Sequence, residues 1–226
     1  MIESGGRIRV WDLPTRIFHG ALAVLVVFSF VTGKVGGGWM EWHLKSGCTI
    51  LTLLVFRLAW GIVGSRTSRF TGFVTGPRAA IRYARETFAK RHPFTPGHNP
   101  LGGWMVVFMI AILLLQAATG LFADDEIATQ GPLAAKVSDA LVSRLTTIHK
   151  YNVWLIAAAA GLHLVAVSTY QWGLKIDLIG PMVHGWKRVP AGLPPAEPAR
   201  ASPILALAVL CAAAAAVYAL VVIYPR

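Results

Sequence analysis

The chain has 226 residues, of which 55% are hydrophobic and only 14% are charged. Soluble domains carry about 25% charged residues, so this composition predicts a membrane protein and excludes disordered, fibrous and disulfide-stapled classes. The net charge is +11, from 21 lysines and arginines against 10 acidic residues. The two cysteines, Cys48 and Cys211, stand in no CxxC or CxxCH motif, which excludes covalent c-type haem and cysteine-rich metal sites.

Five apolar segments are long enough to cross a membrane, which takes about 20 apolar residues. They cover residues 17–33, 43–63, 101–122, 149–172 and 203–224. Because every backbone polar group must be satisfied inside the bilayer, runs of this length are expected to be helices. The fold class we expect is an all-α integral membrane protein with five transmembrane helices; that the first four form a four-helix bundle, with the fifth as an additional C-terminal helix, is what the family resemblance described below implies.

The same pattern predicts the domain organisation. Residues 1–188 form one membrane domain that holds the first four spans. A stretch rich in proline and alanine, 189–202, is typical of an extended linker. Residues 203–226 then form the additional helix.

The positive charges predict the orientation of the chain. Of the 21 lysines and arginines, 14 fall on one side: in the N-terminal tail, in the loop 64–100 and after the fourth span. The opposite side carries fewer, together with an acidic group at 124–126 that is either a solvated turn or a docking patch for a basic partner. The positive-inside rule therefore predicts a cytoplasmic N-terminus and a periplasmic C-terminus. Topology alone accounts for the basic charge, so we expect no nucleic-acid partner.

Four of the seven histidines lie in or at the ends of the spans: His19, His43, His149 and His163. An ionisable residue inside the membrane is costly and points to function by default. His43 and His149 are also open to a merely interfacial role. His163 is not, since it lies about two thirds of the way along an apolar span.

The spacing of the histidines predicts two sites. His149 and His163 are 14 residues apart, about 21 Å along a helix, and face the same side of it, so they cannot share one metal ion. With the predicted orientation, His19 lies at the depth of His163, and His43 at that of His149. Two His–His pairs suit a bis-axial b haem better than zinc, which normally takes three or four protein ligands. Copper would require a cysteine or methionine nearby, and Cys48 is the only such thiol.

Six stretches of the sequence then carry a family resemblance. They are VWDLPTRIFHG (10–20), EWHLKSG (41–47), FRLAWGIVGSRTSRF (56–70), HNPLGGWM (98–105), QAATGLFADD (116–125) and IHKYN…GLH (148–163). Together they resemble the bacterial cytochrome b-561 family of four-helix dihaem membrane cytochromes, which includes the b-type subunit of nickel–iron hydrogenases. The resemblance covers residues 9–186 and implies a multi-pass protein of the bacterial inner membrane, with haem ligands at His19, His43, His149 and His163. The fifth helix departs from the family pattern, and whether it docks a partner or anchors the tail is open.

Other polar residues have two interpretations each. Arg57, inside the second span, either pairs with a haem propionate or reaches the cytoplasmic surface. Arg66 and Arg69 are either interface anchors or contacts for a propionate or a quinone. His92 and His98 lie in the basic loop, where solvation is expected, but His98 begins the third span and is a candidate for a cytoplasmic-side quinone pocket.

We therefore expect a dihaem cytochrome b that carries electrons across the inner membrane, with the haems supplying the redox chemistry. Its partners would be quinone and a periplasmic electron-transfer protein, such as a c-type cytochrome or a hydrogenase. One alternative is a superoxide:quinone oxidoreductase of the same fold, which would need a cationic funnel from Lys34, Lys45 and Lys150. A second alternative is a non-redox anchor or transporter subunit with histidines as proton relays. Enzymatic activity stays open, and a homo-oligomer is compatible with the sequence.

Overall fold

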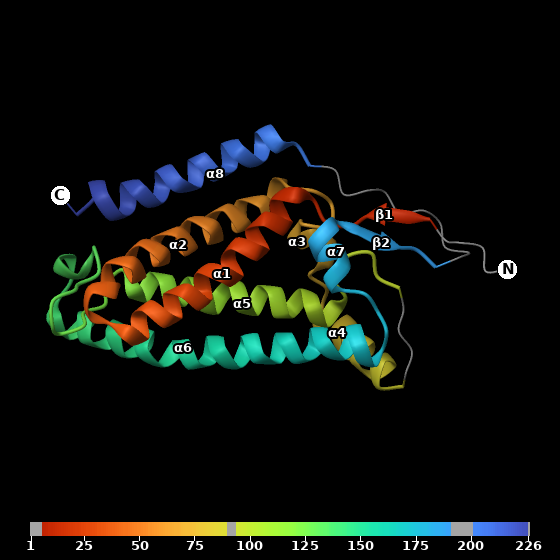
Figure 1. Cartoon of the computed structure of the whole chain (residues 1–226), viewed down its shortest axis with the longest axis horizontal. Coiled ribbons are helices and arrows are strands. Elements are labelled where there is room, and N and C mark those ends of the chain that lie inside the picture. Colours follow the sequence, from red (N-terminus) through yellow and green to blue (C-terminus); the bar gives the residue numbers. More distant parts are fainter. Residues whose placement is uncertain (1–5, 90–93, 191–200, 226) are drawn as a thin grey trace. The chain divides into compact units, whose positions relative to one another are not determined.

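A computed structural model describes residues 6–89, 94–190 and 201–225 of the chain (Figure 1). Five of its helices are long and apolar enough to cross a membrane, which confirms the predicted multi-pass fold. The first four contain the α-helices α1 (Leu13–Val35), α2 (Met40–Val63), α5 (Pro100–Gly120) and α6 (Asp139–Ser168), and the fifth contains α8 (Pro203–Tyr218). A 3₁₀ turn (Gly37–Trp39) precedes α2, and π-helical turns (Thr169–Gly173 and Ala219–Ile223) extend α6 and α8.

The fourth transmembrane helix is longer than its apolar segment. It begins at Asp139, ten residues before the predicted start at His149. The added residues include Ser143, Arg144 and Thr147, which are too polar for a hydropathy window but are compatible with a helix. His149 therefore lies well inside α6 instead of at its end.

The chain divides into two compact units. Unit 1 comprises Met1–Ile17, Ala59–Phe108 and Leu162–Ala206, and unit 2 comprises Phe18–Leu58, Met109–Gly161 and Leu207–Arg226. Each is described by itself below.

Unit 2 is built around one apolar core to which four helices contribute. Its buried residues are Ile50 and Leu54 of α2, Ile112 and Leu113 of α5, and Ile156 and Ala159 of α6, and Leu22 and Leu25 of α1 pack against them. Leu54 is fully buried. A core shared by α1, α2, α5 and α6 is the packing that a four-helix bundle requires.

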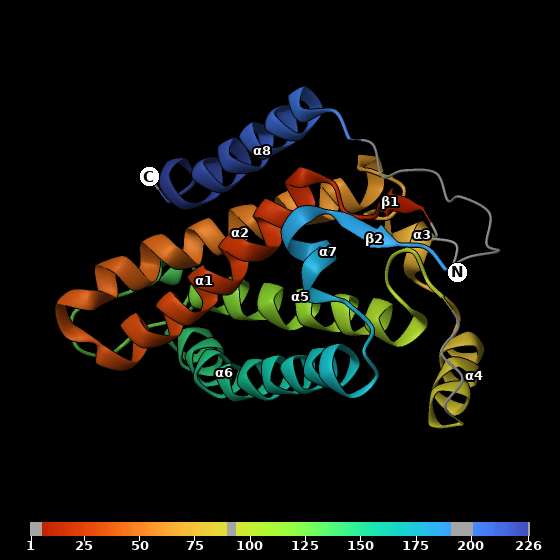
Figure 2. The same ribbon diagram turned by 45° about the vertical axis from the view of Figure 1, so that its right-hand side comes forward.

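The fifth helix, α8, packs on the same unit. Val217 of α8 belongs to a second buried cluster with Leu51 of α2 and Leu121, just after α5. Figures 1 and 2 both show α8 running beside α2. At this end, α8 therefore packs against the bundle helices.

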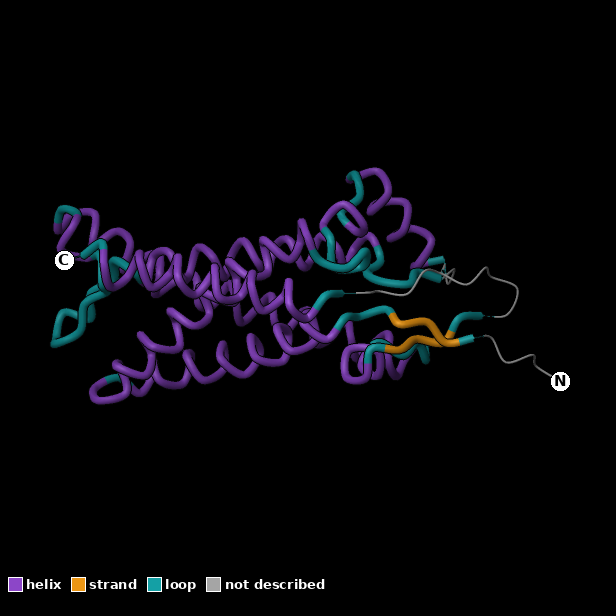
Figure 3. Tube along the Cα trace, turned by 90° about the horizontal axis from the view of Figure 1, so that it is seen from above, coloured by secondary structure: helices purple, strands orange, loops and turns teal. Residues whose placement is uncertain are grey.

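Unit 1 contains a short antiparallel sheet that the sequence did not indicate. Strand β1 (Arg7–Arg9) pairs with β2 (Trp186–Arg188), with Ile8 opposite Lys187 (Figure 3). The unit also holds three short helices: α3 (Phe70–Phe73), α4 (Pro77–Phe88) and α7 (Ile179–His184). A small cluster of Ile8, Val10, Trp11 and Val189 fixes the sheet to the start of α1.

Asp12 joins the start of α1 to the end of α2 within unit 1. It is 2% exposed, caps α1 by accepting from the Thr15 amide at 2.7 Å, and accepts from Ser68 at 2.6 Å and also from Ser65. Burial raises the pKa of Asp12, and the hydrogen bonds from these donors together lower it by more, so its pKa lies below the ordinary value. The carboxylate is therefore the hub of a buried polar network.

Some predicted features lie outside the described residues. Lys90, Arg91 and His92 of the basic loop do so, as do residues 191–200 of the predicted linker.

Candidate functional site

Two of the four candidate haem ligands face each other in unit 2. His43 comes from the first turn of α2, and His149 from the middle of α6. Their ring centroids are 6.0 Å apart, and their planes are nearly perpendicular, at 88°. The sequence predicted this pair only from the depth of each histidine along its membrane span.

Each of these imidazoles is held by a backbone carbonyl of another helix. His43 Nδ1 lies 2.9 Å from the Ser29 carbonyl oxygen of α1, and His149 Nδ1 lies 3.0 Å from that of Gln116 in α5. Because a carbonyl oxygen can only accept, these contacts assign the ring hydrogen to Nδ1 and make Nε2 the acceptor nitrogen of each ring; in His149 this nitrogen faces the Gln116 amide at 3.2 Å. Metal-binding histidines are normally oriented by such a bond from the nitrogen that does not bind the metal.

A buried amide network surrounds His149, and sequence reasoning missed it. Asn152 Nδ2 donates to Gln116 Oε1 at 2.8 Å and to the Ile112 carbonyl at 2.9 Å. Gln116 Nε2 in turn lies 3.2 Å from His149 Nε2 and donates to the His149 carbonyl at 3.1 Å. The available signal was the presence of two amides in otherwise apolar spans, since such groups tend to bond across helices.

Glycines let both imidazoles approach neighbouring backbone. A Cβ at Gly33 of α1 would lie 2.8 Å from His43 Nδ1, and a Cβ at Gly120 of α5 would lie 2.8 Å from His149 Cε1. Both distances are too short for any side chain, so the ring positions depend on glycine at 33 and 120.

These features fit a bis-imidazole metal centre. An imidazole nitrogen binds a first-row metal at roughly 2 Å and lies about 1 Å from its ring centroid, so two rings on opposite sides of one ion have centroids roughly 6 Å apart. The separation of His43 and His149 matches that value. Among the described residues, no group of three or more histidine, cysteine or acidic side chains could hold a metal ion.

The other candidate pair is divided between the two units. His19 is exposed on the part of α1 that belongs to unit 2, and His163 is half-buried on the part of α6 that belongs to unit 1. Their pairing stays a prediction.

Arg57 lies on α2 in unit 2 and is only 2% exposed. In the described structure its side chain is therefore inside the protein instead of extended to the surface. A role toward a haem propionate stays a prediction.

The three quinone candidates lie in unit 1 and differ in their surroundings. Arg66 and Arg69 are exposed. The His98 ring lies 4.6 Å from the buried rings of both Trp11 and Phe73. His98 is partly buried, because Phe73 of α3 and Trp11 pack against its ring, so the structure leaves both the solvated and the quinone-binding interpretation open.

The cations expected to line a funnel in unit 2 are partly engaged. Lys45 forms an ion pair with Glu41 at 2.5 Å. Lys34 lies over the Trp154 ring, 4.7 Å from its centroid, whereas Lys150 is exposed. A pair that compensates its own charge contributes little to long-range attraction of anions.

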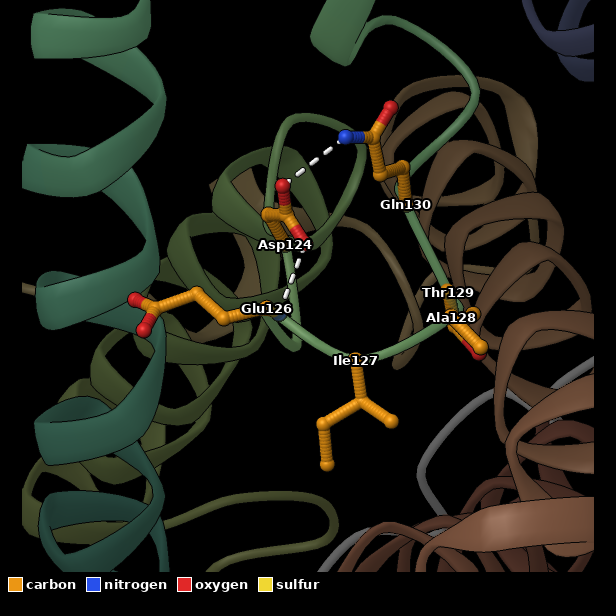
Figure 4. A pocket seen from close by; sticks show the side chains of 6 residues that line it. All are labelled: Asp124, Glu126, Ile127, Ala128, Thr129 and Gln130. Carbon is orange, nitrogen blue, oxygen red and sulfur yellow. Dashed lines mark hydrogen bonds between the residues drawn. The ribbon is translucent and has the colours of Figure 1, made fainter.

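The acidic group at 124–126 belongs to a loop that caps itself. Asp125 Oδ1 accepts from three successive amides, of Ile127, Ala128 and Thr129, at 2.8–2.9 Å. The Thr129 amide, followed by that of Ile127, lowers the pKa of Asp125 to about 2. The loop lines a shallow hollow of about 440 Å³, in which Gln130 Nε2 donates to Asp124 Oδ2 at 2.8 Å (Figure 4). The geometry is that of a solvated turn.

Fold and site together define a class of protein: a multi-pass helical membrane protein with two facing, backbone-anchored histidines beside a four-helix core. The sequence model of the prokaryotic cytochrome b561 family matches residues 10–185, and the chain belongs to this family. It is thus a membrane b-type cytochrome of electron transfer. No curated protein and no solved structure matches the chain.

Proposed function

We propose that the protein is a dihaem cytochrome b that carries electrons across the bacterial inner membrane, between a periplasmic redox partner and the quinone pool. The observation that carries this proposal is the facing pair of His43 and His149 at 6.0 Å, each with Nδ1 on a backbone carbonyl. This pair would hold the periplasmic-side haem, and His19 with His163 would hold the cytoplasmic-side one. When bound, a b haem takes up and releases one electron at its iron.

The chain's own residues would set the properties of each centre. The carbonyls of Ser29 and Gln116 hold the imidazoles in the tautomer that presents Nε2, which raises ligand basicity. Arg57, buried in unit 2, would neutralise a propionate through a charge-assisted hydrogen bond.

Quinone would bind in unit 1, with His98 as the group that hydrogen-bonds it. Reduction of a quinone consumes protons as well as electrons, so its site needs a side chain that can exchange a proton near neutral pH. The His98 ring packs against the buried rings of Trp11 and Phe73, which would fix its orientation toward a bound quinone. Arg66 and Arg69 stand exposed in the same unit.

Stopped-flow reoxidation of the reduced haems by a soluble quinone analogue tests this assignment. We expect His98→Ala or Arg66→Ala to slow reoxidation at least tenfold while the haem absorption spectrum stays unchanged. Lys45→Ala and Lys150→Ala, in unit 2, are the matched controls and should reoxidise normally. Normal rates in the unit 1 variants, with slow rates in the controls, would move the quinone to the other side of the membrane.

The same preparation separates the redox function from the non-redox alternatives. A purified protein that shows no b-type absorption bands after expression with sufficient haem would contradict the proposal. The superoxide-oxidising alternative is not supported by an observation of its own, because the ion pair of Lys45 with Glu41 weakens the cationic funnel that it needs.

A further inference from the structure

Helix α4 of unit 1 has a charged face that the electron-transfer function does not use. Arg78, Arg82 and Arg85 are spaced i, i+4 and i+7, which places them along one side of the helix, and all three are exposed. Ile81 stands among them and is 55% exposed. None of the three arginines makes an ion pair or hydrogen bond with another described residue.

The opposite face of α4 packs on the end of a transmembrane helix. Tyr83 is 6% exposed, and its hydroxyl oxygen lies 3.3 Å from that of Tyr170, in the turn that ends α6. Burial of this face leaves the arginine face pointing away from the protein.

The segment just before α4 is held to the first turn of α5. Trp104 Nε1 donates to the Thr75 carbonyl at 3.0 Å. A Cβ at Gly103 would lie only 2.6 Å from the Phe73 carbonyl oxygen, so this segment lies directly on the α5 backbone.

These contacts set the level of α4 with respect to the membrane. The start of α5 and the end of α6 are the ends of two transmembrane helices, and Trp104 and Tyr170 are residue types that favour the membrane–water interface. Figure 2 shows α4 running across the direction of α5 instead of alongside it. A short basic helix at this level, with one exposed apolar residue, has the features of a helix that lies in the interface.

We propose that the Arg78–Arg82–Arg85 face of α4 is a binding site for the phosphodiester head groups of anionic phospholipids. Guanidinium groups bind phosphate through paired hydrogen bonds, and three in a row give a charge complementary to an anionic leaflet. Ile81 would contact the upper acyl chain. The site would hold α4, and with it the turn carrying Phe73 against His98, at the membrane surface.

Native mass spectrometry of the haem-loaded protein, titrated with phosphatidylglycerol or phosphatidylcholine, tests the proposal. The triple variant R78Q/R82Q/R85Q should bind phosphatidylglycerol about a hundredfold more weakly, at roughly fivefold per arginine, with phosphatidylcholine binding unchanged. The matched control is R7Q/R9Q/R188Q, which removes the same charge from exposed positions of the β1–β2 sheet in the same unit. It should retain wild-type binding.

Several results would overturn the proposal. These are equal phosphatidylglycerol binding by the two triple variants, equal affinity of the wild type for both lipids, or release of the lipid by millimolar inorganic phosphate, which would mark a site for free phosphate. An unchanged haem spectrum and melting temperature in phosphatidylcholine vesicles shows that a variant is folded. If the triple variant fails this check, Arg82→Gln alone should still weaken phosphatidylglycerol binding about fivefold, and no change would refute the site.

Discussion

A methyl group added at Gly120 would collide with the His149 imidazole. The new Cβ would lie 2.8 Å from His149 Cε1, whereas ordinary contacts begin at 3.4 Å, so the ring must retreat by about 0.6 Å. That movement can stretch the His149 Nδ1 bond to the Gln116 carbonyl from 3.0 Å to about 3.6 Å, beyond a hydrogen bond. Gly120→Ala therefore perturbs the ligand without touching it chemically.

The magnitude follows from two terms. Overpacking costs about 1–3 kcal/mol, and the lost hydrogen bond costs about 0.5–1.5 kcal/mol. Since some of this strain relaxes, we expect about 2 kcal/mol against the haem-bound geometry. That corresponds to roughly thirtyfold weaker retention of one haem.

The assay is a redox titration with haem quantification on purified protein. Gly120→Ala should lose the same potentiometric component as His149→Ala, and Gly33→Ala should lose it too, since its Cβ would lie 2.8 Å from His43 Nδ1. Gly161→Ala on α6 is the matched control, because a Cβ there has no neighbour within 4 Å. Full haem retention in both Gly33→Ala and Gly120→Ala, or loss of different components in the two, would refute the reasoning.

Three further predictions use other parts of the structure. Asp12→Asn should lower the free energy of unfolding by about 2 kcal/mol, because it removes a buried charged acceptor. Since the pKa of Asp12 is lowered in the folded state, the wild type has this extra stability above the ordinary pKa and loses it as the pH falls through the folded pKa. Thermal melts from neutral to acidic pH should therefore show the loss in the wild type but not in the variant. Gln116→Leu should retain the haem but shift its midpoint potential by about 30–60 mV, as expected for about 1 kcal/mol of altered ligand bonding, and an unchanged potential would remove the amide from the site. A chain that ends at Pro190 should keep its haem content, since α8 carries no histidine, and loss of haem would make α8 part of the cytochrome domain.

The spans were predictable because a bilayer imposes a length and a composition that the sequence displays directly. Their ends were less predictable. The first turns of α6, from Asp139, are helical but polar, so apolar length placed the start at His149. Hydropathy reports where hydrocarbon lies, whereas the helix continues for as long as its backbone bonds are satisfied.

The small sheet was not predictable from local pattern. Its strands are three residues long and pair Arg7 with Arg188, which lie just outside the two ends of the matched family region. Three residues are too few to show the alternation that marks a strand. Only the tertiary fold brings them together.

The candidate site was likewise predictable only in part. Depth along the spans was enough to pair His43 with His149, because helix geometry converts residue number into position. Depth along the spans could not identify the residues that orient the rings. Gln116 and Gly120 contact His149 because of the way α5 is rotated about its own axis, and the sequence does not give that rotation. The contacts of His98 with Trp11 and Phe73 were not predicted for a similar reason, since both neighbours are distant in sequence.

The number of haems and their ligand pairs test the central claim most directly. A pyridine haemochrome assay on the purified protein should give two b haems per chain. Potentiometric titration of single alanine variants should then show that His43 and His149 remove one component, while His19 and His163 remove the other. One haem in the wild type, or loss of different components in the His43 and His149 variants, would contradict the account.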